Sequence, residues 1–201
     1  MAVRSAFALG LHREETMSCG LFSQDEQAVR RNLWRTLFIM DRFLSTILGR
    51  PTSIRESDCS GETLVKGENA FTPFTPFPTV GYPGFRAAPG LDAAVRSCHI
   101  IGIVLEKVYS KRKVSTKIAQ GIANECSGWQ KTLDPSLKPL EENLRDPAQG
   151  MATLQVNLLY YHSIVLLTRP FFLFLMTKVR ISGMSSIYRL AAHNDFHLAA
   201  I

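Results

Sequence analysis

The sequence lacks the short motifs that mark most enzymes and metal sites. Its four cysteines are far apart in the chain and form no Cys-x-x-Cys pair, so a local zinc site is not indicated. Glycine-rich phosphate loops, Gly-x-Ser-x-Gly and His-Glu-x-x-His are absent, and no two carboxylates are spaced for acid–base chemistry. We therefore predict no catalytic residue, no metal ligand and no cofactor in this chain, which is not expected to be an enzyme.

Features of secreted proteins are also missing. There is no Asn-x-Ser/Thr sequon and no basic-then-apolar leader, so reduced, structural thiols in an intracellular protein are expected.

The net charge of +6 is spread along 201 residues, and only Lys111–Lys113 form a basic run. No nucleic-acid recognition motif accompanies this charge, so we interpret the run as a helix C-terminus, whose dipole favours cations. Direct contact of this segment with DNA is not predicted.

The longest helical pattern runs from Ser23 to Leu48. Ser23 and Glu26 have the spacing of a capping box, and Gly49 followed by Pro51 is typical of a helix C-terminus. Apolar residues recur at helical spacing, so we expect the helix to be buried on well over one face. The expected buried stripe consists of Leu33, Leu37, Met40, Leu44 and Ile47, with Trp34, Phe38 and Leu48 beside it.

One carboxylate interrupts this apolar pattern. Asp41 shares a helix face with Trp34 and Phe38, and a carboxylate there is costly unless it is paired or hydrogen-bonded. Arg42 is its neighbour in sequence and is expected to point elsewhere. Arg50, just past the helix end, or an arginine from another segment is therefore the expected partner of Asp41.

The same stretch resembles the fungal-specific transcription factor domain, the middle homology region of zinc binuclear cluster transcription factors. The shared pattern is RRxLWxxLFxxDRxLSxxLGRPxxIxxxDC, whose mixture of polar and apolar identities is far more specific than helical periodicity. Its matching residues are Arg30, Arg31, Leu33, Trp34, Leu37, Phe38, Asp41, Arg42, Leu44, Ser45, Leu48, Gly49, Arg50, Pro51, Ile54, Asp58 and Cys59.

Two further segments resemble the same family. Near the start, the segment AxxLGLHR is matched by Ala6 and by residues 9–13. Late in the chain, the order LxxxYYxxIxLLxRPF is matched by a segment from Leu158 to Phe171 that includes Arg169 and Pro170. Arg169 thereby becomes a second expected partner for Asp41.

The periodicity and the distribution of proline predict an all-α, multi-helix regulatory domain. Five of the ten prolines and several glycines fall in a segment that we expect to be a long Pro/Gly-rich loop. The first helix has no N-cap and the chain ends in an apolar stretch, so 1–201 is expected to be a partial domain, truncated at both ends. The predicted helices span about 2–15, 24–48, 92–113, 116–133 and 151–176, and the predicted loop spans 60–90.

The segment 151–176 calls for comparison with a membrane span. An uncharged run of 22 residues, from Pro147 to Thr168, approaches the necessary length. Polar residues interrupt it, however, and Arg169 precedes its most apolar end, where a charge is expensive in a bilayer. We therefore favour a buried helix and no membrane contact, and a bilayer anchor is the weaker alternative.

The resemblance implies a nuclear protein that controls transcription by RNA polymerase II. It also implies that DNA and zinc are bound by a cysteine-rich module absent from this chain, that the protein forms a homodimer, and that a small-molecule effector or a transcriptional co-regulator acts on this domain. As a mechanism, we hypothesise that the helix end carrying Trp34, Asp41 and Arg50 packs against Arg169 and Pro170 and holds one domain state.

The residues with a predicted structural or regulatory role are Arg31, Trp34, Asp41, Arg42, Gly49, Arg50, Pro51, Asp58, Cys59, Arg169 and Pro170. The alternative function is a helical small-molecule-binding protein or an enzyme without a recognisable motif. Such a protein needs a buried polar pocket, for which Tyr160, Tyr161 and His162 are the only starting point.

Overall fold

The structure is a computed structural model that describes the backbone of residues 1–60, 63–64, 87–110 and 115–198. Side chains are described within these ranges except for residues 87–89, 116, 148, 175 and 178–198. All regular elements in the described ranges are helices, which confirms the predicted all-α class. In chain order they are α1 (Ala2–Ala8), α2 (Glu14–Met17), α3 (Gln24–Leu48), the 3₁₀ helix η1 (Glu56–Asp58), α4 (Ala87–Val104), the π-helix η3 (Leu105–Ser110), α5 (Thr116–Thr132), the 3₁₀ helix η4 (Pro135–Leu137), α6 (Glu141–Leu144) and α7 (Pro147–Leu198).

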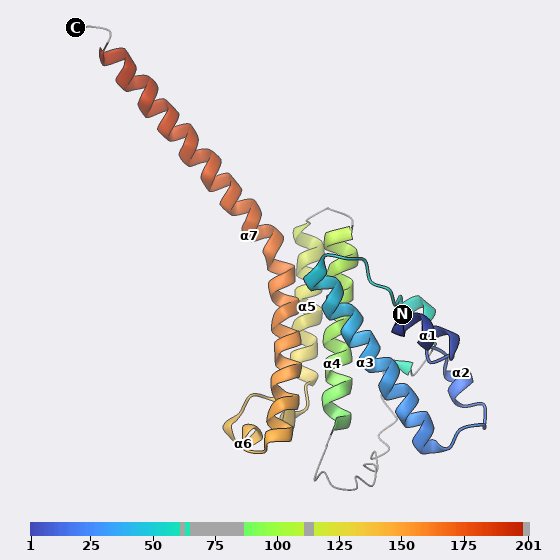
Figure 1. Ribbon diagram of the computed structural model, residues 1–201. Coiled ribbons are helices and arrows are strands. Elements are labelled where there is room, and N and C mark those ends of the chain that lie inside the picture. Colours follow the sequence, from blue (N-terminus) through green and yellow to red (C-terminus); the bar gives the residue numbers. More distant parts are fainter. Residues whose placement is uncertain (61–62, 65–86, 111–114, 199–201) are drawn as a thin grey trace.

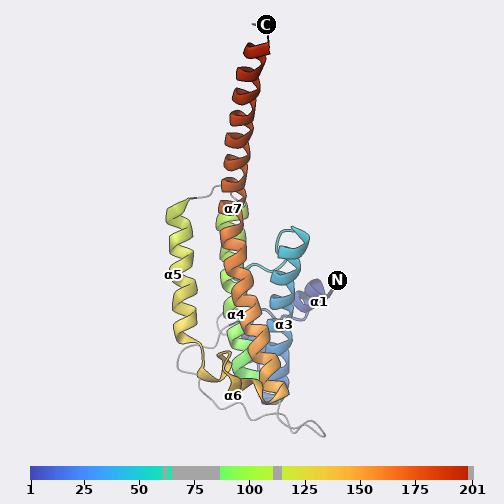
Figure 2. The ribbon, with the colours of Figure 1, turned by 90° about the vertical axis from the view of Figure 1, so that its left-hand side faces the viewer.

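The helices form a bundle around α4. Helices α4 and α7 lie side by side, α5 covers one side of this pair and α3 covers the other (Figures 1 and 2). Helix α1 packs on α3, and α7 continues beyond the bundle towards the C-terminus (Figure 1). Because α4 is surrounded by neighbours, it is apolar on most of its circumference. Its buried apolar residues are Ala93, Ala94, Val95, Cys98, Ile100, Ile101 and Val104.

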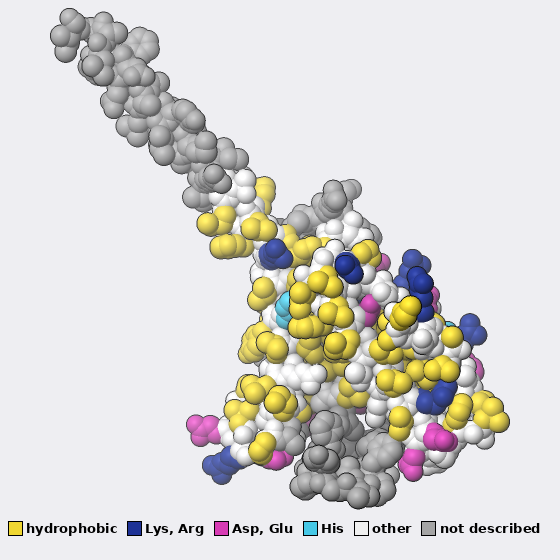
Figure 3. Space-filling view, viewed as in Figure 1, with side chains coloured by type: hydrophobic (Ala, Val, Ile, Leu, Met, Phe, Trp, Pro, Cys, Tyr) yellow, Lys and Arg dark blue, Asp and Glu magenta, His cyan; other side chains and the backbone are white. Residues whose placement is uncertain are grey.

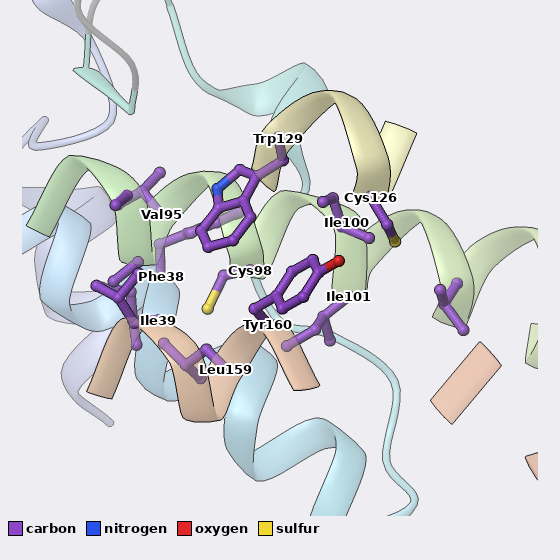
Figure 4. Close-up of a cluster of buried hydrophobic side chains, with 14 of the residues drawn as sticks. Phe38, Ile39, Val95, Cys98, Ile100, Ile101, Cys126, Trp129, Leu159 and Tyr160 are labelled. Carbon is purple, nitrogen blue, oxygen red and sulfur yellow. The ribbon is translucent and has the colours of Figure 1, made fainter. Parts of the chain in front are cut away.

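The core lies where α3, α4, α5 and α7 meet (Figure 4). Phe38 of α3, Cys98 of α4 and Trp129 of α5 are buried there. The rings of Trp129 and Tyr160 stack with centroids 4.7 Å apart, which joins α5 to α7. Complete burial of one large apolar side chain contributes about 1.5–3 kcal/mol, so this four-helix junction supplies much of the stability of the bundle.

Helix α3 begins and ends where its sequence predicts. The Ser23 hydroxyl accepts from the backbone N–H of Glu26 at 3.3 Å, and the Glu26 carboxylate accepts from the backbone N–H of Ser23 at 2.9 Å. Gly49 adopts a left-handed φ of 62° that a residue without Cβ tolerates, and Pro51 follows it. The chain turns back at this point and runs along the end of the helix.

The predicted burial of the α3 stripe is wrong for most of its members. Trp34 and Phe38 are fully buried, but the neighbouring stripe at heptad spacing is about half exposed. Helix α3 contacts α1 and α4 through the face that carries Trp34, Phe38 and Arg42, which leaves the adjacent face open. Helix α7 exposes a second stripe, and apolar side chains over both helices are visible in Figure 3. The exposed residues are Leu33, Met40, Leu44, Ile47 and Leu48 of α3 and Met151, Leu154, Leu158, Tyr161 and Val165 of α7.

Other predicted boundaries also need correction. The helix expected over 2–15 is broken into α1 and α2, because Gly10 takes a left-handed φ of 68° between them. The helix expected over 92–113 begins at Ala87 and becomes a π-helix from Leu105, while 111–113 lie outside the described residues. The helix expected over 116–133 is α5 and matches to within one residue at its end.

The last predicted helix is longer than expected. Helix α7 begins at Pro147 and continues through Pro170 to Leu198, beyond the predicted end at residue 176. Most of the predicted loop 60–90 lies outside the described residues, and its final residues belong to α4. None of the helices in the described part of the chain is long and apolar enough to cross a membrane.

Candidate functional site

A buried ion pair joins two adjacent residues near the C-terminal end of α3. Arg42 Nη1 donates to Asp41 Oδ2 at 3.0 Å and to the carbonyl oxygen of Ile54 at 2.9 Å. Asp41 also accepts from the backbone N–H groups of Ser53 and Ile54, at 2.9 and 3.1 Å. The side chains of Arg42 and Asp41 are only 4% and 6% exposed, so both charges lose most of their hydration. The ion pair and the hydrogen bonds to backbone groups compensate for this loss. The pair thereby fastens the segment after α3 to the helix.

The predicted partner of Asp41 is therefore wrong. Arg42 does not point elsewhere: its guanidinium lies over the Phe38 ring, 4.3 Å from the centroid, and reaches back to Asp41. The turn after α3 supplies the other two donors. Neither Arg50 nor Arg169 forms a salt bridge with Asp41 in the described part of the chain.

The ion pair extends to α4 through a second carboxylate. Glu56 Oε1 lies 3.6 Å from Arg42 Nη2, and Glu56 Oε2 lies 2.5 Å from Nδ1 of His99 on α4. Gly102, one turn after His99, allows this approach, since a Cβ there would lie 2.9 Å from Arg42 Nε. Three segments of the chain therefore meet at one charged cluster, which we call the Arg42 cluster: Asp41, Arg42, Glu56 and His99.

The charges of this cluster shift the pKa values of its two less buried members, Glu56 and His99. The hydrogen bond that His99 donates to the Glu56 carboxylate raises the pKa of His99, against the opposite effect of burial. Burial disfavours the ionised form of Glu56, but the hydrogen bond and charge of His99, together with Arg42, outweigh it and lower the pKa of that carboxyl. Both shifts favour the charged pair.

Two further ion pairs join α3 to other segments, one to the N-terminal part of the chain and one to α4. Arg31 forms a two-pronged salt bridge with Glu14 of α2, in which Nε donates to Oε2 at 3.2 Å. Arg35 is buried, pairs with Asp92 of α4 at 2.9 Å and donates to the carbonyl oxygen of Thr63 at 3.2 Å. These contacts give Arg31 a structural role and add Arg35, which the sequence interpretation did not single out.

Trp34 packs towards the N-terminus and away from α7. Its ring lies edge-on to Phe7, with centroids 5.3 Å apart, and 6.0 Å from His12. The hypothesis that Trp34 packs with Asp41 and Arg50 against α7 is therefore wrong for Trp34. Because α3 is a long helix, Trp34 and Arg50 lie several turns apart.

Pro170 lies inside α7 and creates an unpaired carbonyl one turn before it. Proline has no N–H, so the carbonyl oxygen of Leu166 cannot receive the usual helical hydrogen bond from position 170. The hydroxyl of Tyr109, on η3, donates to this oxygen at 3.0 Å. The bond joins the π-helix to α7 next to Arg169.

A cavity of about 910 Å³ lies beside the Arg42 cluster, within the usual size range of ligand pockets. Its walls come from the end of α3, the segment after it, α4, η3 and α7. Five of the residues predicted from the sequence line this cavity: Arg42, Gly49, Arg50, Pro51 and Arg169. The structure therefore brings together most of the residues placed at the α3 end and one from the late helix.

Asp58 is the last residue of η1 and Cys59 follows it, and neither residue lines the cavity. Asp58 is exposed, and the Cys59 thiol contacts the carbonyl oxygen of Arg55 at 3.5 Å. Burial raises the pKa of Cys59 to about 11 and that of Cys98 to about 12, so both remain neutral thiols at physiological pH. No group of three or more metal-ligating side chains gathers within the described residues.

Sequence reasoning missed three contributors to this region. Glu56, His99 and Tyr109 act through contacts between residues that are 43 and 57 positions apart in sequence. Neither Glu56 nor His99 belongs to a local motif in the sequence. Only a turn that reverses the chain after Pro51 brings Glu56 to α4.

The structure is thus an all-α bundle with a buried Arg–Asp pair near the C-terminal end of its capped helix α3. The chain belongs to the family described as the fungal specific transcription factor domain, whose family model matches residues 1–113. The match covers both the α3 pattern and the Arg42 cluster, so the resemblance seen in the sequence is confirmed.

Curated relatives are fungal regulators. The chain is 28% identical over 180 residues to "Filamentous growth regulator 27" of Candida albicans, covering 86% of this chain and 22% of that protein. It is 25% identical over 210 residues to "Activator of stress genes 1" of Saccharomyces cerevisiae, covering 99% of this chain and 21% of that protein. The chain thus spans about a fifth of the length of these relatives. No solved structure matches it significantly.

Proposed function

We propose that this domain regulates a nuclear zinc-cluster transcription factor that controls transcription by RNA polymerase II. DNA and zinc are bound by a separate module, and this chain contributes a switchable helical body with no catalytic role. The observation that carries the proposal is the convergence of family-pattern residues on one cavity: Arg42, Arg50 and Pro51 from the α3 region face Arg169 from α7. An effector or co-regulator that binds one arrangement of these segments better shifts the domain towards it.

The first test of this function uses a tethered reporter. The chain is inserted between an unrelated DNA-binding module and an activation segment, and reporter output is compared with that of a fusion carrying an unrelated helical domain of similar size. We expect the chain to change the output, and a fluorescent fusion of the protein to accumulate in the nucleus. Equal output from the two fusions at equal protein levels contradicts a regulatory role.

Homodimerisation is a second part of the proposed function, supported by the two exposed stripes of α3 and α7. On α7 the exposed residues Met151, Leu154, Leu158, Tyr161 and Val165 follow alternating spacings of three and four, the pattern of a coiled-coil seam. The two stripes together contain ten large, half-exposed apolar side chains. An interface of standard size buries about 800 Å² per partner, which a surface of this kind can supply. We infer that a second copy of this chain covers the stripes.

Sedimentation equilibrium tests the dimer. We expect the purified chain to sediment as a dimer, and Leu44→Glu combined with Leu158→Glu to give a folded monomer, because both substitutions place charges in the proposed seam. Gln120→Glu, at an exposed position on α5 outside both stripes, is the control. A wild-type chain that remains monomeric at micromolar concentration contradicts dimerisation through this face.

A further inference from the structure

The cavity beside the Arg42 cluster carries an excess of positive charge. Its charged lining consists of four arginines against Glu56 and Glu106, with His99 also in the wall. Arg42 is already engaged by Asp41 and Glu56, and His99 is engaged by the same glutamate. The cavity therefore keeps arginine charge beyond what its own carboxylates neutralise.

Three of the lining arginines have no carboxylate partner in the described part of the chain. Arg50 and Arg55 follow α3, Arg169 lies on α7, and all three side chains are exposed to solvent at the cavity. Glu106 is the one acidic lining residue outside the Arg42 cluster, and no ion pair joins it to these arginines. The guanidinium groups come from two different segments that line the same cavity.

The rest of the lining determines what kind of anion fits. The hydroxyl group of Thr52 provides a neutral hydrogen-bonding group, whereas Ile103 and Leu166 provide apolar wall; the hydroxyls of Ser45 and Thr46 already donate to backbone carbonyls. A planar carboxylate matches the two-pronged geometry of a guanidinium, and a short hydrocarbon skeleton matches the apolar wall. A cavity of about 910 Å³ exceeds the volume that an inorganic anion requires.

We propose that this cavity binds a small organic acid with two or more carboxylates, held between Arg50 and Arg55 on one side and Arg169 on the other. This inference deepens the proposed function, on which it rests, by naming the chemical class of the effector. The bound acid joins the segment after α3 to α7 at the point where Tyr109 contacts Leu166. Occupancy therefore stabilises α7 against the Arg42 cluster.

The test is isothermal titration calorimetry on the purified chain with citrate, succinate and inorganic phosphate as separate probes, at physiological salt. We expect saturable binding of citrate or succinate, and little heat from phosphate. Arg55→Gln and Arg169→Gln should each weaken binding about tenfold or more, since each removes a charge-assisted hydrogen bond. Arg145→Gln, an exposed arginine on the loop after α6, is the matched control and should bind as wild type does.

Several outcomes overturn the inference. It fails if neither carboxylate gives saturable binding at millimolar concentration, if phosphate binds as tightly as both acids, or if Arg145→Gln weakens binding as much as Arg169→Gln does. Thermal melts of the variants check that all remain folded, as expected for exposed side chains. Because calorimetry needs no transcription, a chain that binds citrate but leaves the reporter unchanged refutes the proposed function alone, and the reverse result refutes this inference alone.

Discussion

The hydroxyl of Tyr109 donates to the carbonyl oxygen of Leu166, which Pro170 leaves without its helical donor. A side chain from the π-helix thus replaces a backbone hydrogen bond in a helix 57 residues away. The bond stabilises α7 where Arg169 faces the cavity. It also explains how a proline is accommodated inside a helix of 52 residues.

The replacement of a helical hydrogen bond by Tyr109 predicts a non-additive pair of mutations. Tyr109→Phe should lower the free energy of unfolding by about 1–2 kcal/mol, because it leaves a carbonyl oxygen unpaired. In a Pro170→Ala background the new backbone N–H pairs with Leu166, so the same Tyr109→Phe change should cost clearly less. Urea denaturation of the four proteins measures this coupling. Equal costs in both backgrounds would show that the hydroxyl does not compensate for the proline.

The Asp41–Arg42 pair predicts a large loss of stability from a small change. Asp41→Asn retains the shape but removes the nearer, buried counter-charge of Arg42 and leaves only the partly exposed Glu56 at 3.6 Å, so we expect a loss of about 3 kcal/mol. Asp25→Asn, an exposed carboxylate in the first turn of the same helix, should change stability by less than about 1 kcal/mol. Chemical denaturation compares the two variants. A similar small effect at both positions would mean that the buried pair contributes little.

Gly102 and Gly121 form a matched pair of helical glycines. A Cβ at Gly102 would lie 2.9 Å from Arg42 Nε and 3.3 Å from Glu56 Oε1, so Gly102→Ala should displace the Arg42 cluster and destabilise the fold. A Cβ at Gly121 meets nothing within 4 Å, so Gly121→Ala should stabilise α5 by about 0.5–1 kcal/mol. Thermal melts measure both changes in stability. A stabilising Gly102→Ala would contradict the close approach of Arg42 to α4.

The Glu56–His99 pair predicts a pH-dependent contribution to stability. The raised pKa of His99 means that its contribution is complete below the ordinary value of 6.5 and is lost as the pH rises through the folded-state value. The lowered pKa of Glu56 means that its contribution is present above 4.5 and is lost as the pH falls through the folded-state value. The pair therefore stabilises the fold most between these two ordinary values.

His99→Gln tests this dependence. Because half of the His99 side chain is exposed, we expect wild type to exceed the variant by at most about 1 kcal/mol near pH 5.5, and by less at pH 8. His162→Gln is the control, since burial lowers the pKa of His162 and gives its titration the opposite sign. A wild-type advantage that grows from pH 5.5 to pH 8 would contradict the ion pair.

Some features of this fold are local in sequence and others are not. The ends of α3 were predictable because Ser23, Glu26 and Gly49 act within one turn of the helix they terminate. The buried face of α3 was not predictable, because periodicity shows which apolar residues share a face but not which face a neighbouring helix covers. The backbone donors to Asp41 from Ser53 and Ile54 and the bond of Tyr109 to Leu166 depend on chain reversals that no residue pattern encodes.

The most direct test of the account compares three tethered reporters, which carry the wild-type chain, Arg169→Gln and the control Arg145→Gln. We expect Arg169→Gln to alter reporter output relative to wild type at equal protein levels, because the cavity then loses its positive charge from α7. Arg145→Gln should leave the output unchanged. Identical output from all three fusions would contradict the claim that the cavity beside the Arg42 cluster controls this domain.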